Sequence, residues 1–282
     1  MENVIFTNKD QIEQIKKKMA QDGPEKIHIL ADFDRTLTKS HIDGKKVPSL
    51  ISVLRDEEYL TPDYPEKAHK LFEKYNAIEE NTSISEEEKK KAMREWWTKH
   101  FELLIQSGLS RKDIEQAVQS HAIQFREGFD EFLDFLKKHN IPLVIISSSG
   151  LGQESIKAHL RYTEKEYQRL YIVSNSYQWD EQGKAIAVNE PIVHTMNKDE
   201  TVLKDFSFYN KIKEKTNVLL LGDSLSDVNM IHGFNYTNLI KIGFLNEKVE
   251  ERKEAYQGKY DIIIPNNGEL TFLNNFLKDI VG

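Results

Sequence analysis

The chain contains no cysteine and no long apolar segment. Without cysteine it can form neither a disulfide nor a thiolate nucleophile, and it cannot hold zinc through sulfur. No apolar run reaches the roughly 18 residues that a membrane-spanning helix needs, and the polar start Met1-Glu2-Asn3 has no apolar signal core behind it. A formal net charge of −7 argues against a nucleic-acid backbone or an anionic membrane as the main partner. We therefore expect a soluble, cytoplasmic protein.

The residues that are present can build a globular fold of one large or two ordinary domains. Hydrophobic residues make up 39% and charged residues 30% of the 282 residues, which suits a buried core and a soluble surface. Residues 41–125 are rich in Glu and Lys, have helical periodicity and lack strand-like apolar runs. We therefore predict a mostly helical insertion at 41–125, and a second unit formed by residues 1–40 and 126–282.

The flanking unit alternates apolar runs with amphipathic segments. Strands are expected at 27–31, 141–146, 171–174, 217–221, 239–244 and 261–265. Helices are expected at 129–140, 153–161 and 200–214. A turn at 180–183 indicates a hairpin between 177–179 and 185–188. This order predicts an α/β fold with a parallel sheet, helices on both faces, and a site outside the carboxyl ends of the strands.

Three of these predicted strands end in polar clusters. Asp32 and Asp34 follow the first strand and start in the same direction, because residues two apart in a strand share a face. Asp223 and Asp227 follow a later strand, and the serines of 147–149 open a helix after another. Carboxylates are ligands that Mg²⁺ accepts together with water and phosphate, and a helix start can meet an anion. The alternatives are an ordinary turn for the aspartates and a helix cap for the serines.

A phosphate carries more negative charge than a helix end neutralises, so a cation is needed as well. Lys198, between the predicted hairpin and the next helix, is the candidate, and its alternative is a solvated surface lysine. Other phosphate motifs are missing. The spacing Gly150-Leu151-Gly152 lacks the third glycine of a dinucleotide fingerprint, and there is no Walker-type Gly-Lys-Ser/Thr.

Together these motifs resemble the four-part signature of haloacid-dehalogenase-like phosphohydrolases. Residues 32–38 (DFDRTLT) are similar to its DxDxT element, and the serines, Lys198 and residues 222–227 follow in the expected order. Within that superfamily the chain resembles the pyrimidine 5′-nucleotidase (cytosolic 5′-nucleotidase III) group. The similar segments are 44–48, 74–79, 95–99, 194–198 and 239–249. The resemblance implies a Rossmann-like three-layer core with a parallel sheet and a helical cap, residues 41–125, inserted after the first core strand.

The resemblance also implies the chemistry. Asp32 would be the nucleophile that forms an aspartyl-phosphate. Asp34 would protonate the leaving alkoxide and then act as a base on water. Mg²⁺ would be held by Asp32, the backbone carbonyl of Asp34 and Asp223, with Asp227 close behind. The phosphate oxygens would be held by Thr36, Ser147 or Ser148, and Lys198.

The nucleobase would be recognised by the cap. In the similar family a cap glutamate accepts hydrogen bonds from the base, and Glu79 stands at that position; the alternative is a solvated glutamate at a helix end. Trp96, Trp97 and His100 share one helix at stacking distance from a ring, and we expect at most one tryptophan to contact the base, since a helical tryptophan more often packs in a core. His100 replaces a small hydroxyl residue of the family at a position that contacts the nucleotide. Arg35 and the third serine are further departures from the family pattern.

The leading hypothesis is Mg²⁺-dependent hydrolysis of nucleoside 5′-monophosphates, pyrimidine ones preferred, to nucleoside and phosphate. A first alternative is a phosphatase for another small monoester, such as a sugar phosphate. A second is a non-catalytic nucleotide-binding protein on the same scaffold, against which stands the presence of Asp32, Asp34, Lys198 and Asp223. The expected partner is the small-molecule substrate, and no protein partner is implied.

Overall fold

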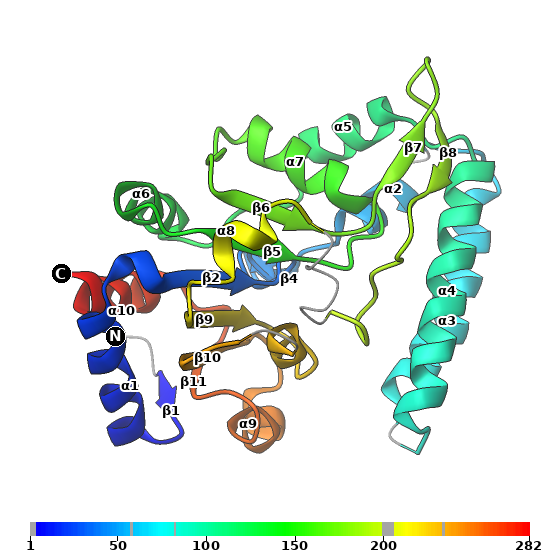
Figure 1. Ribbon diagram of the computed structural model, residues 1–282. Coiled ribbons are helices and arrows are strands. Elements are labelled where there is room, and N and C mark those ends of the chain that lie inside the picture. The colour runs from blue at the N-terminus through cyan, green and yellow to red at the C-terminus, as the bar shows by residue number, and fades with distance from the viewer. Residues whose placement is uncertain (1–3, 57–58, 82, 199–205, 233–234) are drawn as a thin grey trace.

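The computed structural model describes residues 4–56, 59–81, 83–198, 206–232 and 235–282, and it confirms the predicted α/β fold (Figure 1). At its centre lies a seven-stranded sheet in the order β1-β11-β10-β9-β2-β5-β6. Its strands are β1 (Ile5–Phe6), β2 (Ile27–Ala31), β5 (Leu143–Ile146), β6 (Leu170–Val173), β9 (Asn217–Gly222), β10 (Asn238–Leu245) and β11 (Ile262–Pro265). The neighbouring strands are parallel, apart from β1, which pairs antiparallel with β11 at one edge. Strand β1 was not predicted, because two residues are too few to show a period.

Helices cover both faces of this sheet. Successive side chains of a strand point to opposite faces, so in β2 Ile27 and Ile29 join one buried cluster and Leu30 joins another. The first cluster is completed by α1 (Lys9–Asp22), α6 (Phe129–His139), α7 (Gly152–Tyr162) and α10 (Thr271–Val281). The second is completed by α8 (Tyr209–Ile212), the 3₁₀ helix η3 (Asp227–Ile231) and α9 (Val249–Gln257). The protein therefore has the three layers of a Rossmann-like fold.

The region between β2 and β5 is mostly helical. It contains the short hairpin strands β3 (His41–Ile42) and β4 (Lys45–Lys46), and the helices α2 (Leu50–Asp56), α3 (Tyr64–Glu80), α4 (Glu86–Gln106) and α5 (Arg111–Gln119). Ser85 and Ser110 begin α4 and α5 with complete capping boxes. Figure 1 shows α3 and α4 packed together at a distance from the sheet. The apolar cluster of these helices also takes in Tyr177 of β7 (Tyr177–Trp179) and Ala185 of β8 (Ala185–Val188). The division at residues 40 and 126 stays a prediction.

The chain enters and leaves this helical region at neighbouring points. The Lys39 amide donates a hydrogen bond to the Gln124 carbonyl at 2.9 Å, and Thr38 and Phe125 form an isolated antiparallel bridge. One residue further on, the Arg126 amide donates to the Leu37 carbonyl at 3.0 Å. The two connections thus form a short ribbon beside the carboxyl end of β2.

Two predicted elements differ from the structure. Of the helix expected at 200–214, residues 200–205 lie outside the described part of the chain. In the part that is described, residues 206–208 form a bend and turns and only α8 is helical. Strand β5 begins at Leu143 rather than at residue 141, after Pro142, which has no backbone N–H to donate to a ladder. Among the described helices, none combines the length and the apolar character needed to cross a membrane.

Candidate active site

The candidate site lies where three adjacent parallel strands end. Strand β2 is flanked by β9 and β5, and the residues that follow these strands are Asp32, Asp223 and Ser147. The Asp32 amide still donates to the Leu221 carbonyl at 3.0 Å, so its backbone continues the ladder of the sheet. Parallel strands bring their carboxyl ends to one edge, which explains why residues almost 200 positions apart in the sequence meet here.

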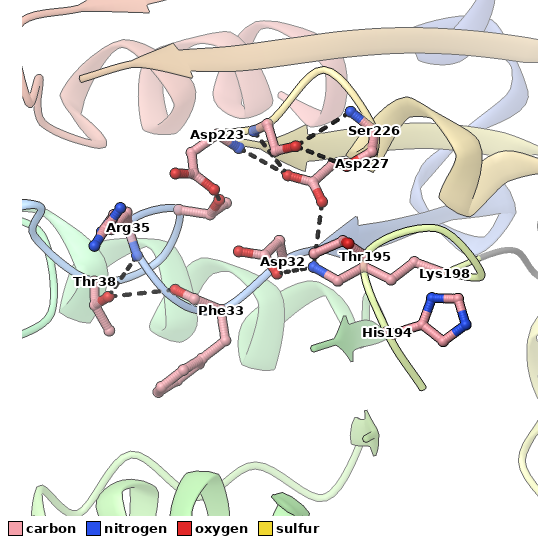
Figure 2. A network of polar contacts seen from close by, with 12 residues as sticks. Asp32, Phe33, Arg35, Thr38, His194, Thr195, Lys198, Asp223, Ser226 and Asp227 are labelled. Carbon is pink, nitrogen blue, oxygen red and sulfur yellow. Dashed lines mark hydrogen bonds and ion pairs between the residues drawn. The ribbon is translucent and has the colours of Figure 1, made fainter. Parts of the chain in front are cut away.

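Lys198 lies among the carboxylates of this edge (Figure 2). Its Nζ is 2.5 Å from Asp32 Oδ1 and 3.2 Å from Asp227 Oδ1, and all three side chains are buried. The loop before it is held by Asn197, whose side chain accepts from the His194 amide and donates to the Ile192 carbonyl. A buried ammonium is costly unless it is paired, and here it is paired with two carboxylates. Lys198 is therefore not the solvated surface lysine that was the alternative prediction.

Asp227 organises the loop that follows β9. Its second oxygen, Oδ2, accepts from the amides of Asp223 at 3.1 Å and Ser224 at 2.9 Å. Gly222 leaves room for this turn, since a Cβ there would lie 2.5 Å from the Asp227 Cβ. Two buried tyrosines hold the same loop from below: the Tyr260 hydroxyl donates to the Ser224 carbonyl at 2.5 Å, and the Tyr256 hydroxyl donates to the Asp223 carbonyl. Asp227 therefore fixes both the loop and Lys198.

The charges of the site do not balance by themselves. Burial raises the pKa of Asp32 to about 7 against the attraction of Lys198, and burial together with repulsion from Asp32 raises the pKa of Asp223 well above its ordinary value. Burial alone would lower the pKa of Lys198, but the Asp227 and Asp32 carboxylates outweigh it and raise this pKa, so Lys198 stays charged. One ammonium thus faces three carboxylates, of which those of Asp32 and Asp227 are buried and that of Asp223 is partly buried, and a further positive charge would relieve their repulsion.

A divalent cation fits this donor set. Asp32, Asp223 and Asp227 each offer a carboxylate oxygen, and the three oxygens lie within 4.8 Å of one another. All-oxygen donors suit a hard ion such as Mg²⁺, which keeps some water and takes few protein ligands. Both oxygens of Asp227 already accept hydrogen bonds, so Asp32 and Asp223 are the more available ligands.

The loop after β2 turns sharply between Asp32 and Thr38. Phe33 is buried in the core and points away from Asp32, as Figure 2 shows. Arg35 has a φ of 62°, in the left-handed region, and its amide donates to the Thr38 hydroxyl at 2.9 Å. Burial is also the main cause that raises the pKa of Asp34, although Lys198 and Arg35 oppose it. The alternative of an ordinary turn thus gives way to a tightly bonded loop that presents two carboxylates.

Two cavities meet at Asp34. The first, of about 200 Å³, is lined by the charged residues of the site, including Asp32, Lys198 and Asp223. The second, of about 580 Å³, lies between the helical region and the core, and its walls include Phe72, Trp96 and Trp97. Asp34 and Ser148 line both cavities. A molecule with a charged end and an aromatic end could therefore extend from one cavity into the other past Asp34.

The predicted phosphate ligands have different surroundings. Ser147 and Ser148 line the smaller cavity, whereas Ser149 bonds to Ser155 and to the Leu151 amide at the start of α7. Thr36 is fully buried, and its hydroxyl is 3.5 Å from Asp223 Oδ1, a long contact. Ser147 and Ser148 thus lie at the smaller cavity, whereas Ser149 is bonded within its turn and lines the larger cavity, and the register of the serine motif stays a prediction.

The predicted base-reading residues are only partly in the larger cavity. His100 lines it, 3.3 Å from the Gly150 carbonyl and edge-on to Trp97 at 5.5 Å, and burial lowers its pKa to about 4. Glu79 instead accepts a hydrogen bond from the Thr195 hydroxyl at 2.8 Å, which connects α3 to the loop of Lys198. Trp96 lines the cavity while it stacks on Tyr75.

Sequence reasoning missed two residues of this region. Tyr64 lines the larger cavity, and its buried hydroxyl has no hydrogen-bonding partner among the described residues. Arg126 is buried behind the loop of Asp32 and Asp34 and donates to several of its carbonyls. Neither position carried a signal, because a tyrosine at a helix start and an arginine in a polar segment are ordinary surface residues.

Fold and site together define a class of protein. The fold is similar to that of a haloacid-dehalogenase family hydrolase from Salmonella enterica, with a TM-score of 0.57 and 16% identity over 91% of this chain and 73% of that one. It is also similar to a phosphoserine phosphatase in a phospho-aspartyl analogue form, with a TM-score of 0.51 and 17% identity over 89% and 97%. The chain thus has the fold of haloacid-dehalogenase-like hydrolases.

Closer relatives identify the family. A family profile described as "Pyrimidine 5′-nucleotidase (UMPH-1)" matches residues 35–281. The human 7-methylguanosine phosphate-specific 5′-nucleotidase is 32% identical over 99% of this chain and 92% of its own length, and the Gallus gallus protein of that name is 32% identical over 94% and 91%. Cytosolic 5′-nucleotidase IIIB, solved bound to cytidine, has a TM-score of 0.90 and 28% identity over 99% and 94%. The chain belongs to the pyrimidine 5′-nucleotidase (UMPH-1) family, and it is a 5′-nucleotidase of the haloacid-dehalogenase type.

Proposed function

We propose that the enzyme uses Mg²⁺ to hydrolyse nucleoside 5′-monophosphates, pyrimidine ones preferred, to nucleoside and phosphate. The observation that carries this proposal is the position of Asp34 between the small charged cavity and the larger aromatic one. A phosphate beside Lys198 and a base beside Trp96 or Trp97 would bring the bond between phosphorus and the ester oxygen next to Asp34. The pyrimidine preference is supported by the description of the family and by the cytidine in the related IIIB enzyme.

The proposed reaction has two displacements. Asp32 attacks phosphorus through a carboxylate oxygen, and the bond to the ester oxygen breaks while Asp34 gives that oxygen its proton. Water then attacks the aspartyl-phosphate, Asp34 takes the proton of the water, and the bond between phosphorus and Asp32 breaks. Burial raises the pKa of Asp34, which favours the protonated form that an acid needs.

The remaining residues of the small cavity would bind and orient the phosphate. Lys198, Ser147 and Ser148 line it and would hold phosphate oxygens, with Thr36 behind them. Mg²⁺, held by Asp32, Asp223 and the Asp34 carbonyl with Asp227 close behind, would offset the negative charge of the phosphate and the carboxylates.

Base recognition is proposed for His100 and Glu79. His100 lines the aromatic cavity, whereas Glu79 would have to exchange its bond to Thr195 for one to the base. Glu79→Gln tests this point, because cytosine offers an amino donor that uracil lacks. A carboxylate that reads the base should make the variant lose more activity on CMP than on UMP, whereas equal losses would assign Glu79 to the Thr195 contact alone.

A second candidate substrate is 7-methylguanosine 5′-monophosphate. The human and chicken relatives are named for it. Methylation at N7 makes the guanine ring cationic, and a cationic ring stacks well on the aromatic walls that Phe72, Trp96 and Trp97 give the cavity.

A phosphate-release panel tests the proposal. It should contain CMP, UMP, AMP, GMP, 7-methyl-GMP and two sugar phosphates, each with Mg²⁺ and with the metal chelated. We expect the highest kcat/KM for CMP or UMP, followed by 7-methyl-GMP, and no activity without metal. A preference for sugar phosphates with no activity on the nucleotides would refute the substrate class, and full activity in chelator would refute the metal.

A further inference from the structure

Arg126 lies beneath the loop that carries both candidate catalytic aspartates. Its side chain is 2% exposed, and its guanidinium stacks on the Phe244 ring at 4.3 Å. Its Nε donates to the Thr36 carbonyl at 2.7 Å, and its Nη2 donates to the Arg35 carbonyl. Further bonds go to segments later in the chain, namely the Gly268 carbonyl at 2.6 Å and the Asn246 side chain at 2.7 Å.

The backbone of Arg126 extends this set of contacts. Its amide donates to the Leu37 carbonyl at 3.0 Å, so one residue binds three consecutive carbonyls, those of residues 35, 36 and 37. Asn246 adds a bond from its Nδ2 to the Arg35 carbonyl at 3.0 Å. Arg35 is the residue with the left-handed φ, a conformation that persists in a non-glycine residue only when its surroundings impose it.

Asp32 and Asp34 depend on this loop to different degrees. Asp32 continues the β2 ladder through its amide, and its carboxylate contacts Lys198. The Asp34 carboxylate makes no hydrogen bond or ion pair within the described residues, so its position is set by the backbone around it. The carbonyls that Arg126 binds begin at the very next residue, Arg35.

We propose that Arg126 is a positioning residue that sets the place of Asp34 relative to Asp32. The proposal rests on the proposed role of Asp34, which gives its proton to the ester oxygen while the bond from phosphorus to that oxygen breaks and the bond to Asp32 forms. Arginine suits the task because its donors form a rigid planar fork that can bind several carbonyls at once, which the single ammonium of lysine cannot do.

The consequence depends on the leaving group. A strongly basic leaving oxygen needs a proton as it departs, and a shift of about 1 Å in the acid can cost on the order of a hundredfold in rate. A weakly basic leaving group such as p-nitrophenolate departs without that proton. Disturbing Arg126 should therefore slow phenyl phosphate much more than p-nitrophenyl phosphate, although both esters need Asp32, Lys198 and the metal equally.

The experiment compares kcat/KM for phenyl phosphate and p-nitrophenyl phosphate, with Mg²⁺, in wild type, Arg126→Met and Arg126→Lys. This constant reports the first displacement and leaves out the later hydrolysis of the aspartyl-phosphate, which is the same for both esters. We expect the value for phenyl phosphate divided by that for p-nitrophenyl phosphate to fall by about a hundredfold in Arg126→Met and by less in Arg126→Lys. Asp34→Asn should show the same selective loss, since it removes the proton itself. Equal losses on both esters, or an unchanged ratio, would overturn the positioning role.

Two further variants separate positioning from stability. Asn238→Ala removes a buried hydrogen bond to Asn217, at the opposite end of β10, and should lower stability without changing the ratio. If the Arg126 variants do not fold, Asn246→Ala removes a bond to Arg35 and an acceptor of Arg126, and a wild-type ratio in that variant overturns the proposal.

The outcome is independent of the nucleotide panel. Both aryl esters are small and bypass base recognition, so a failure of the proposed substrate class leaves this comparison intact. An Asp34→Asn variant without any leaving-group dependence would instead refute the proposed acid, and the positioning role with it.

Discussion

His159 offers a sharp test of the physical reasoning, because it is a histidine buried in an apolar setting. It lies on α7, is 2% exposed, and has no hydrogen-bonding partner at either ring nitrogen among the described residues. Its ring contacts Phe125 at 4.9 Å and Phe33 edge-on at 6.1 Å. Burial lowers its pKa from 6.5 to about 4, since nothing there solvates an imidazolium. We predict that His159→Leu makes the protein more resistant to acid.

The size of the effect follows from the two pKa values. The unfolded chain binds the proton first, at its pKa of 6.5, so the folded state loses stability as the pH falls from about 6.5 to about 4. At pH 5 the loss from this residue is about 2 kcal/mol, and below pH 4 it approaches about 3 kcal/mol. That is a large part of the stability of a typical domain, about 5–15 kcal/mol.

Urea unfolding of wild type and His159→Leu at pH 7.5 and pH 5 measures this difference. Any packing change caused by leucine is the same at both pH values. The informative quantity is therefore how the gap, the difference in the free energy of unfolding between the two proteins, changes with pH. We expect the gap to move by about 2 kcal/mol in favour of His159→Leu at pH 5. The exposed His232→Leu is the matched control and should leave the gap unchanged. If wild type and His159→Leu lost the same free energy of unfolding between pH 7.5 and pH 5, the argument would be refuted.

Three further predictions concern the site. Asp32→Asn should reduce phosphate release to background while circular dichroism and nucleotide binding stay close to wild type; turnover at the wild-type rate would refute the nucleophile. His100→Ser should widen the aromatic cavity beside Gly150 and raise kcat/KM for 7-methyl-GMP relative to CMP by up to about tenfold, measured as a ratio of initial rates. Gly222→Ala should cost about 1–3 kcal/mol in urea unfolding and lower activity, because its Cβ would lie 2.5 Å from Asp227 Cβ and 2.7 Å from the Tyr260 hydroxyl; unchanged stability would contradict the close packing of this turn.

The features that could be predicted from the sequence are those determined by residues that lie close together in the chain. The apolar run before Asp32 and that before Asp223 marked buried strands, and a parallel sheet brings the residues after such strands to one edge. The helix starts at Ser85 and Ser110 are also local features, because a capping box lies within four residues. Such patterns depend only on residues that are neighbours in the sequence, so they can be recognised before the fold is known.

The missed features depend on contacts between distant residues. Arg126 lies in a polar segment, and the groups that its side chain binds include those of residues 35, 36, 246 and 268, which are far away in the sequence. Glu79 bonds to Thr195, 116 positions away, which no pattern around either residue indicates. Within the described part of the helix predicted at 200–214, only Tyr209–Ile212 is helical, since an apolar period does not tell how much of a segment the tertiary structure keeps helical.

The ribbon formed by residues 38–39 and 124–125 has a consequence for how such proteins diversify. The helical region leaves and re-enters the core through strands that bond to each other, so its two ends are fixed at adjacent points whatever lies between them. The entropy of closing a longer loop grows only with the logarithm of its length, by about 0.6 kcal/mol for each doubling. A lineage can therefore lengthen, shorten or exchange this region as one unit, while the sheet that ends in Asp32 and Asp223 is inherited unchanged.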